Sequence, residues 1–165
     1  MNLVTALALV IGALGALATW LFLDPLSALG LQIWAAFIAW GSFYHCGGGD
    51  AGLKNSIVGA IWGALMATVA LIAMPIVGMG AVGAGLCVGA TVVAMILGAH
   101  VPLLSVIPAA VYGYASTAAF ALMKSGAVAD SAAITTSPFL NIVVSMIIGS
   151  LLGYVSEKLA KSLAT

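Results

Sequence analysis

The chain has 165 residues, of which 64% are hydrophobic and only 5% charged, and its four lysines balance its four acidic residues. Its mean hydropathy is +1.29, and it contains no arginine. Because soluble domains carry about 25% charged residues, this composition excludes a soluble globular protein. The sequence predicts an integral membrane protein with the lipid bilayer as its main partner, and it offers no basic surface for nucleic acid.

Six membrane-crossing segments are predicted, since a bilayer core of about 30 Å needs roughly 20 apolar residues in a helix. Dividing the chain where charges, prolines and glycines cluster places them near Leu3–Leu23, Leu31–Tyr44, Ser56–Val77, Met79–Ala99, Leu103–Met123 and Pro138–Ser156. The first segment is interpreted as a retained helix, because it has neither a basic leader nor a small-residue cleavage pattern. The expected fold class is an all-α integral membrane protein with a single membrane domain, residues 1–165.

Lysine positions indicate the orientation of these segments. With both termini in the cytoplasm, Lys54, Lys158 and Lys161 lie inside and Lys124 lies outside. This distribution follows the tendency of basic residues to stay on the cytoplasmic side.

Two predicted helices carry the same spaced pattern, Asn-x3-small-x3-Gly-x3-small. "NSIVGAIWGALMA" aligns with "NIVVSMIIGSLLG", which pairs Asn55 with Asn141, Gly59 with Ser145, Gly63 with Gly149 and Ala67 with Gly153. A spacing of four places these residues on one stripe, where small side chains let helices approach closely in lipid. The stripes predict two equivalent close helix crossings.

The preceding helices align as well, because "AAFIAWGS" at 35–42 resembles "AAVYGYAS" at 109–116. Two halves of three helices each, residues 1–77 and 78–165, must enter the membrane in opposite orientations because three is odd. The sequence therefore predicts a 3+3 inverted repeat with a substrate path near the middle of the membrane. The alternative is a chance alignment of glycine-rich helices, since 20 residues are Gly.

A polar face is predicted on the fifth segment. Ser105, Pro108, Tyr112 and Ser116 follow one another at spacings of three, four and four. Pro108 removes a backbone N–H, which membrane proteins tolerate where protein or water satisfies the freed carbonyl. The face either lines a wet path or forms a polar seam between packed helices. Asn55 and Asn141 join it as candidates for the substrate path.

Aromatic residues gather on one face of the second segment, with Trp34, Phe37 and Trp40 spaced by three residues and Tyr44 following. One interpretation is packing toward lipid or the membrane interface. The other is that Phe37 and Trp40 constrict a narrow pore that selects solutes by size.

The stretch "FYHCGGGDAGLKN" between the second and third segments contains His45, Cys46 and Asp50. Adjacent residues cannot easily chelate one metal ion, there is no CxxC motif, and the glycines do not form a phosphate-binding loop. No metal or cofactor is expected. The glycines instead predict a turn at the membrane surface, in which Asp50 caps the next helix and pairs with Lys54. As an alternative role, His45 and Asp50 are pore-mouth candidates, where His45 would confer pH sensitivity.

Two stretches, "CGGGDAGLK" and "LLSVIPAAVYGYASTAAFAL", together resemble the YcdZ-like family of small bacterial inner-membrane proteins of unknown function. The resemblance covers residues 1–157. It implies a multi-pass protein of the bacterial inner membrane and supplies no activity or site residue.

No nucleophile–base pair, paired carboxylates or cofactor motif is present, so we do not expect an enzyme. Few charges in the spans argue against a proton relay or a strongly ion-coupled pump. The leading hypothesis is a channel or facilitative transporter for a small neutral or weakly ionised solute, on the scale of urea, ammonia, glycerol or a short acid. The alternative is a non-transporting scaffold of a larger membrane complex. Spare small-residue stripes also predict a homo-oligomer, with a trimer as the chosen size.

Overall fold

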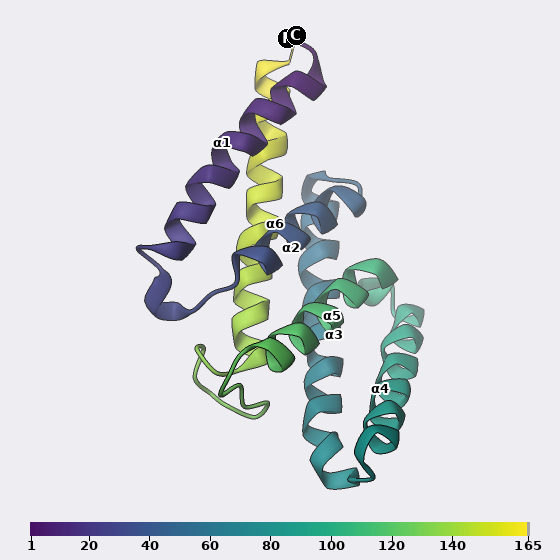
Figure 1. Ribbon diagram of the computed structural model, residues 1–165. Helices are drawn as coiled ribbons and strands as arrows, with labels where there is room; N and C mark the ends of the chain where they lie inside the picture. The colour runs from purple at the N-terminus through teal and green to yellow at the C-terminus, as the bar shows by residue number, and fades with distance from the viewer. Residues whose placement is uncertain (165) are drawn as a thin grey trace.

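The computed structural model describes residues 1–164 and contains six α-helices and no strand in that range (Figure 1). The helices are α1 Leu3–Leu23, α2 Ile33–His45, α3 Gly49–Val77, α4 Gly80–Leu97, α5 Ile107–Met123 and α6 Pro138–Leu163. Short 3-10 turns occupy Ser27–Leu29, Gly98–His100 and Pro102–Leu104. The predicted all-α class and the number of helices are confirmed.

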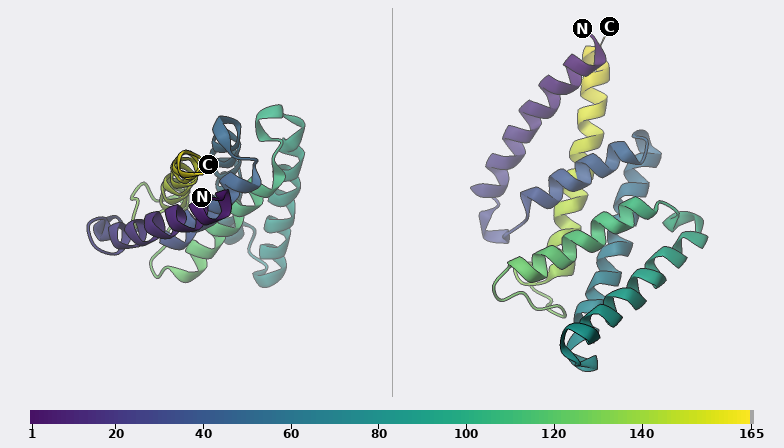
Figure 2. Two further views of the ribbon diagram at one scale, coloured as in Figure 1. Left: turned by 90° about the horizontal axis from the view of Figure 1, so that it is seen from above. Right: turned by 45° about the vertical axis from the view of Figure 1, so that its right-hand side comes forward.

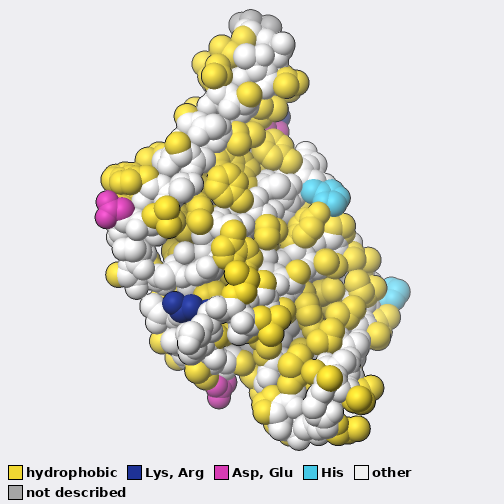
Figure 3. Space-filling view, in the orientation of Figure 1, with side chains coloured by type: hydrophobic (Ala, Val, Ile, Leu, Met, Phe, Trp, Pro, Cys, Tyr) yellow, Lys and Arg dark blue, Asp and Glu magenta, His cyan; other side chains and the backbone are white. Residues whose placement is uncertain are grey.

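Four of the helices are long and apolar enough to cross a membrane: α1, α3, α4 with its 3-10 extension, and α6. Helix α5 is apolar but has 17 residues, and α2 has 13. Large apolar side chains such as Val4, Ile76 and Leu122 are exposed, and apolar atoms cover much of the face in Figure 3. Such a surface is typical of a membrane-embedded protein.

The bounds of α1 match the prediction, and those of α2 and α4 lie within two residues of it, whereas three other helices differ by more. Helix α3 begins at Gly49 rather than Ser56, because the turn uses only residues 46–48. Helix α5 begins at Ile107 rather than Leu103, since Pro108 fits the first helical turn, where its missing N–H is not needed. Helix α6 continues beyond Ser156 to Leu163, and Ala160 there packs against α1.

Helices α3 and α6 contact each other and run in opposite directions, and each carries its own set of partners (Figure 1). Helix α5 packs mainly on α3 and α2 mainly on α6, while α4 packs on α3 and α1 on α6. Figure 2 shows the α1–α6 and α3–α4 pairs at opposite ends of the molecule. Exchanging α1, α2 and α3 for α4, α5 and α6 therefore reproduces the same set of pairings.

Two of these pairings are backbone-to-backbone contacts at glycine. A Cβ atom on Gly63 of α3 would overlap the carbonyl oxygen of Ala110 on α5. A Cβ atom on Gly149 of α6 would overlap the carbonyl oxygen of Ala36 on α2. Both glycines are buried. The predicted stripes therefore lie at helix crossings that only glycine permits at this distance.

These contacts lead to a prediction about stability. Gly63→Ala should destabilise the protein by about 1–3 kcal/mol, because the new methyl group must push two backbones apart. Gly41→Ala is the control, since Gly41 is exposed within α2 and a Cβ atom added to it would meet no neighbour within 4 Å. This control should be neutral or stabilise by about 0.5–1 kcal/mol through helix propensity. Thermal unfolding in detergent micelles measures the change in stability of both variants. Equal melting temperatures for the two would contradict the close α3–α5 contact at Gly63.

Candidate functional site

Helices α2 and α5 run antiparallel, contact α3 and α6 (Figure 1), and meet each other at both of their ends. We call the space between their facing sides, from His45 and Tyr112 at one end to Trp34 and Lys124 at the other, the α2–α5 seam. Residues of both helices line a small cavity at the second end. The seam includes two residues of the predicted polar face and one predicted pore-mouth residue.

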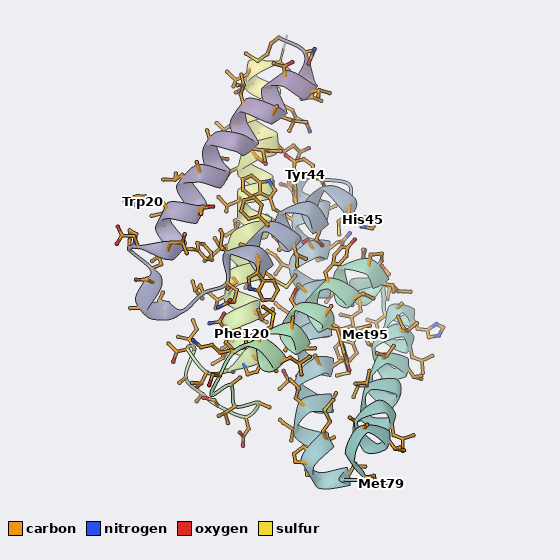
Figure 4. The ribbon with its side chains drawn as sticks, viewed as in Figure 1. Trp20, Tyr44, His45, Met79, Met95 and Phe120 are labelled. Atoms are coloured by element: carbon orange, nitrogen blue, oxygen red, sulfur yellow. The ribbon has the colours of Figure 1, made fainter. Side chains whose placement is uncertain are left out.

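The first end of the seam is closed by a hydrogen bond between His45 and Tyr112. The Nδ1 atom of His45 lies 2.9 Å from the Tyr112 hydroxyl, and the ring centroids are 5.9 Å apart. His45 is exposed where α2 ends, beside α5 (Figure 4). The sequence placed these residues in two separate candidate groups, and the fold brings them together.

Ser116 lies in the middle of the seam, on the same face of α5 as Tyr112 and Phe120 because all three are spaced by four residues. Its side chain is buried, and its Oγ atom has no hydrogen-bond partner among the described residues. Phe120 is 1% exposed and packs in a cluster that includes Ala39 of α2 and Met146 of α6. A free hydroxyl is thus followed along the seam by an aromatic ring, which Figure 4 labels.

Other hydroxyls of this chain satisfy themselves on their own helix. The side chains of Thr19, Thr68, Thr91 and Ser145 each donate to the carbonyl four residues earlier, at 2.8–2.9 Å. This bond is the ordinary arrangement for Ser and Thr within a helix. Only the neighbours Ser116 and Thr117 are buried hydroxyls without a partner in residues 1–164. Thr117 shares its face with Gly113, which packs against Ala60 of α3, so it points away from the seam.

The second end of the seam holds a cavity of about 140 Å³, lined by Gln32, Trp34, Phe120, Met123 and Lys124. The Trp34 indole donates to the Gln32 side-chain oxygen at 2.9 Å, and the Gln32 amide donates to the Gly30 carbonyl at 2.6 Å. The Gln32 backbone N–H donates to Ser145 of α6 at 2.9 Å. A fixed polar cluster therefore faces the buried ring of Phe120.

Two residues of the predicted polar face lie elsewhere. Ser105 precedes α5, is exposed, and donates to the Pro102 carbonyl at 2.9 Å. Its placement on one helical face with Ser116 is wrong because α5 begins only at Ile107. Pro108 is exposed in the first turn of α5.

The aromatic stripe of α2 divides between the surface and the interior. Phe37 is exposed, whereas Trp40 is 4% exposed and its indole donates to Ser156 of α6 at 2.9 Å. Their rings stack with centroids 5.7 Å apart. Packing toward lipid or the interface is therefore wrong for Trp40, because the α2–α6 contact covers its ring.

The two asparagines of the predicted stripes have different surroundings. Asn141 is buried, and its amide donates to the carbonyls of Gly30 and Ile134 at 3.0 Å each, while its Oδ1 atom has no partner in residues 1–164. It ties the α1–α2 connection to the α5–α6 connection. Asn55 is half-buried near the start of α3.

The glycine-rich stretch forms the predicted turn between α2 and α3. Gly47, Gly48 and Gly49 all have positive φ, from 62° to 92°, which glycine alone adopts freely. The Gly49 N–H donates to the Oε2 atom of Glu157 at 2.7 Å. Capping by Asp50 is wrong, because Asp50 lies inside the first turn and accepts from the Tyr154 hydroxyl at 2.7 Å.

The chemistry of the turn offers little to a metal or redox centre. Burial raises the pKa of the Cys46 thiol, opposed in part by its hydrogen bond with Ser42. A thiol with a raised pKa is a poor nucleophile and a poor metal ligand. In residues 1–164, no three His, Cys, Asp or Glu side chains form a group that could hold a metal ion.

Sequence reasoning missed Phe120, Thr117, Gln32 and Glu157. Gln32 is the one glutamine of the chain and stands at the edge of a predicted span, so its position carried a usable signal. Phe120 lies in an apolar run and Glu157 follows a span, and neither pattern indicates which distant helix the side chain contacts.

These features define an all-helical protein with a polar seam between two shorter helices, and its long apolar helices and exposed apolar side chains are typical of membrane-embedded proteins. The chain belongs to the family described as "Protein of unknown function (DUF1097)", which matches residues 8–161. No curated protein and no solved structure matches the chain significantly. The prediction of an uncharacterised family is thus confirmed, and the YcdZ-like name and the bacterial source stay predictions.

The turn gives a second testable prediction. Glu157→Ala should destabilise the protein by about 1–2 kcal/mol and speed hydrogen exchange at residues 47–53, because the Gly49 N–H loses a charged acceptor. Lys161→Ala is the control, since it removes the ion pair with Glu157 but leaves the bond to Gly49. Its cost should stay below about 1 kcal/mol. Equal increases of hydrogen exchange in the turn for the two variants would contradict the role of Glu157 as the acceptor of the Gly49 N–H.

Proposed function

We propose that this protein is a channel or facilitative transporter for a small neutral or weakly ionised solute, which moves along the α2–α5 seam. The observation that carries the proposal is the buried Ser116 hydroxyl without a protein partner, between the His45–Tyr112 pair and the polar cavity at Gln32. Leaving a buried hydroxyl unpaired costs about 1–3 kcal/mol. A passing polar solute would supply the missing partner.

The groups along the seam favour solutes without a full charge. Apart from His45 at one end and the residues of the cavity at the other, the polar groups of the seam are the Tyr112 phenol and the Ser116 hydroxyl. Neither offsets the cost of moving an ion into an apolar interior. Molecules on the scale of urea, ammonia or glycerol can exchange hydrogen bonds with hydroxyls. A short acid would pass in its protonated form.

Phe120 acts as the constriction of the path in this proposal. Its ring is buried beside Ala35 and Ala39 of α2, and it borders the cavity at the Gln32 end. An aromatic ring at this position limits solute size without binding the solute strongly. Passive flow in both directions is the expected behaviour.

We further propose that the protein is a 3+3 inverted repeat with six membrane-crossing helices. The proposal is supported by the helix pairings, which are unchanged when the halves are exchanged, and by the two matching glycine crossings. Helices α2 and α5 then lie at the interface between the halves, where inverted-repeat transporters hold their substrates.

A bacterial inner membrane with both termini in the cytoplasm is the location we propose. Lys54, Lys158 and Lys161 would then lie on the cytoplasmic side with the α2–α3 turn, and Lys124 on the other side. Both termini lie at the same end of the fold (Figure 1), as an even number of crossings requires.

We also propose a homo-oligomer, with a trimer as the expected size. Small-residue faces on the two peripheral helices support it. Gly12 on α1 and Gly85 and Gly89 on α4 are exposed, and a Cβ atom added to any of them would meet no neighbour within 4 Å. Such faces favour association in lipid.

Transport through the seam can be tested by removing each unpartnered hydroxyl in turn. Ser116→Ala should lower the permeability of liposomes to urea and glycerol about 2- to 10-fold, because the solute loses one hydrogen bond. Thr117→Val is the matched control, since it removes the neighbouring buried hydroxyl that faces away from the seam, and it should change permeability little. Stopped-flow light scattering measures the flux against empty liposomes.

Two outcomes would contradict the proposal. Wild-type protein that passes none of the tested solutes faster than empty liposomes would favour the scaffold alternative. Equal losses of permeability in Ser116→Ala and Thr117→Val would place the path elsewhere.

Phe120→Ala should raise the flux of glycerol more than that of urea, because a larger opening favours the larger solute.

A further inference from the structure

A second cavity lies away from the seam, between the last turns of α3 and the long α5–α6 connection. Its volume is about 480 Å³, within the range of small-molecule sites. Its lining is Leu71, Ile72, Pro75, Ile76, Ala121, Ala127, Ala129, Asp130 and Pro138. All of these side chains except that of Asp130 are apolar.

The lining residues include one carboxylate and one carbonyl that lacks its helical hydrogen bond. Pro75 lies inside α3 and has no N–H, so the Leu71 carbonyl has no donor four residues later. Asp130 is exposed, and its carboxylate has no hydrogen bond or ion pair within residues 1–164. A carbonyl and a carboxylate beside apolar walls select a ligand that donates hydrogen bonds and carries positive charge.

The wall formed by the α5–α6 connection is held by its own hydrogen bonds. The Val128 N–H donates to the Thr136 carbonyl at 2.9 Å, and the hydroxyls of Ser131 and Thr136 lie 2.7 Å apart. Asn141 of α6 holds the Ile134 carbonyl at 3.0 Å. The segment that carries Asp130 is therefore ordered before any ligand arrives, which lowers the entropic cost of binding.

We propose that this pocket binds a protonated amine on an apolar chain. The ammonium group would face the Asp130 carboxylate and the Leu71 carbonyl, and the apolar part would lie against Ile72, Pro75 and Ile76. A hydrated divalent cation fits poorly, because Ca²⁺ and Mg²⁺ need several oxygen ligands and the remaining walls are hydrocarbon. The amine is either a free small molecule or the headgroup of an amine-bearing lipid.

The probe for the test is 2-phenylethylamine at pH 7, with the protein in nanodiscs of phosphatidylcholine, and binding is followed by isothermal titration calorimetry. Asp130→Asn should weaken binding about tenfold or more, because a neutral amide replaces the charged acceptor. Asp24→Asn is the matched control. Asp24 is another exposed acid in a helix connection and does not line the pocket, so its variant should bind like the wild type. The neutral analogue 2-phenylethanol should bind weakly and equally to all three proteins.

Further arms distinguish the source of the amine and test the pocket itself. If 2-phenylethylamine binds more weakly when the nanodiscs that hold the protein contain phosphatidylethanolamine, the ligand is a lipid headgroup. If its binding is unchanged, the ligand is a free amine. Ala129→Phe should abolish binding by filling the cavity, with its melting temperature checked against the wild type. The proposal is overturned if 2-phenylethylamine does not bind the wild type, if Asp130→Asn binds it as tightly as the wild type does, or if Asp24→Asn loses as much affinity.

Discussion

The arrangement of this protein depends on the direct backbone contact of two glycines with neighbouring helices. Gly63 lies against the Ala110 carbonyl and Gly149 against the Ala36 carbonyl, with no side chain between them. Helices in lipid gain little from burying apolar surface against each other, so close van der Waals packing must hold them together. Once α5 is fixed on α3 and α2 on α6 in this way, the facing sides of α2 and α5 are set. The seam is therefore a consequence of the two crossings.

A polar group in such a core must find its partner within the protein. Several hydroxyls here bond to their own helix, and Ser56 and Ser150 pair with each other across α3 and α6 at 3.0 Å. Tyr114 pairs with Thr91 across α5 and α4 at 2.9 Å. The hydroxyls of Ser116 and Thr117 depart from this pattern, and that of Ser116 does so where α2 and α5 face each other. A buried polar group without a partner lowers stability, so its presence is better explained by function.

Periodicity in the sequence predicted what depends on local patterns. The apolar run gave α1 its bounds, and the four-residue spacing of Gly59 and Gly63 gave the stripe that contacts α5. It could not show that Glu157 reaches the turn at Gly49, because that bond joins residues 108 positions apart. It also could not assign Trp40 to the interior, since an indole beside lipid and an indole against α6 have the same spacing. The site combines both kinds of information, and its pairing of His45 with Tyr112 required the fold.

The connections at the two ends of the seam differ in length and structure. This difference gives the two ends of the protein different surfaces, although the helix pairings are the same in both halves. Under the proposed repeat, the α2–α3 turn corresponds to the α5–α6 connection. The first uses residues 46–48 and is tied to α6 by Glu157. The second uses residues 124–137, is tied to α6 by Asn141, and leaves the Asp130 pocket against α3. Because both connections are anchored to α6, the extra residues of the second change its surface without disturbing the crossings. In the proposed inverted repeat, the helices would keep the symmetry that close packing in lipid favours, while the two connections would differ because they face opposite sides of the membrane.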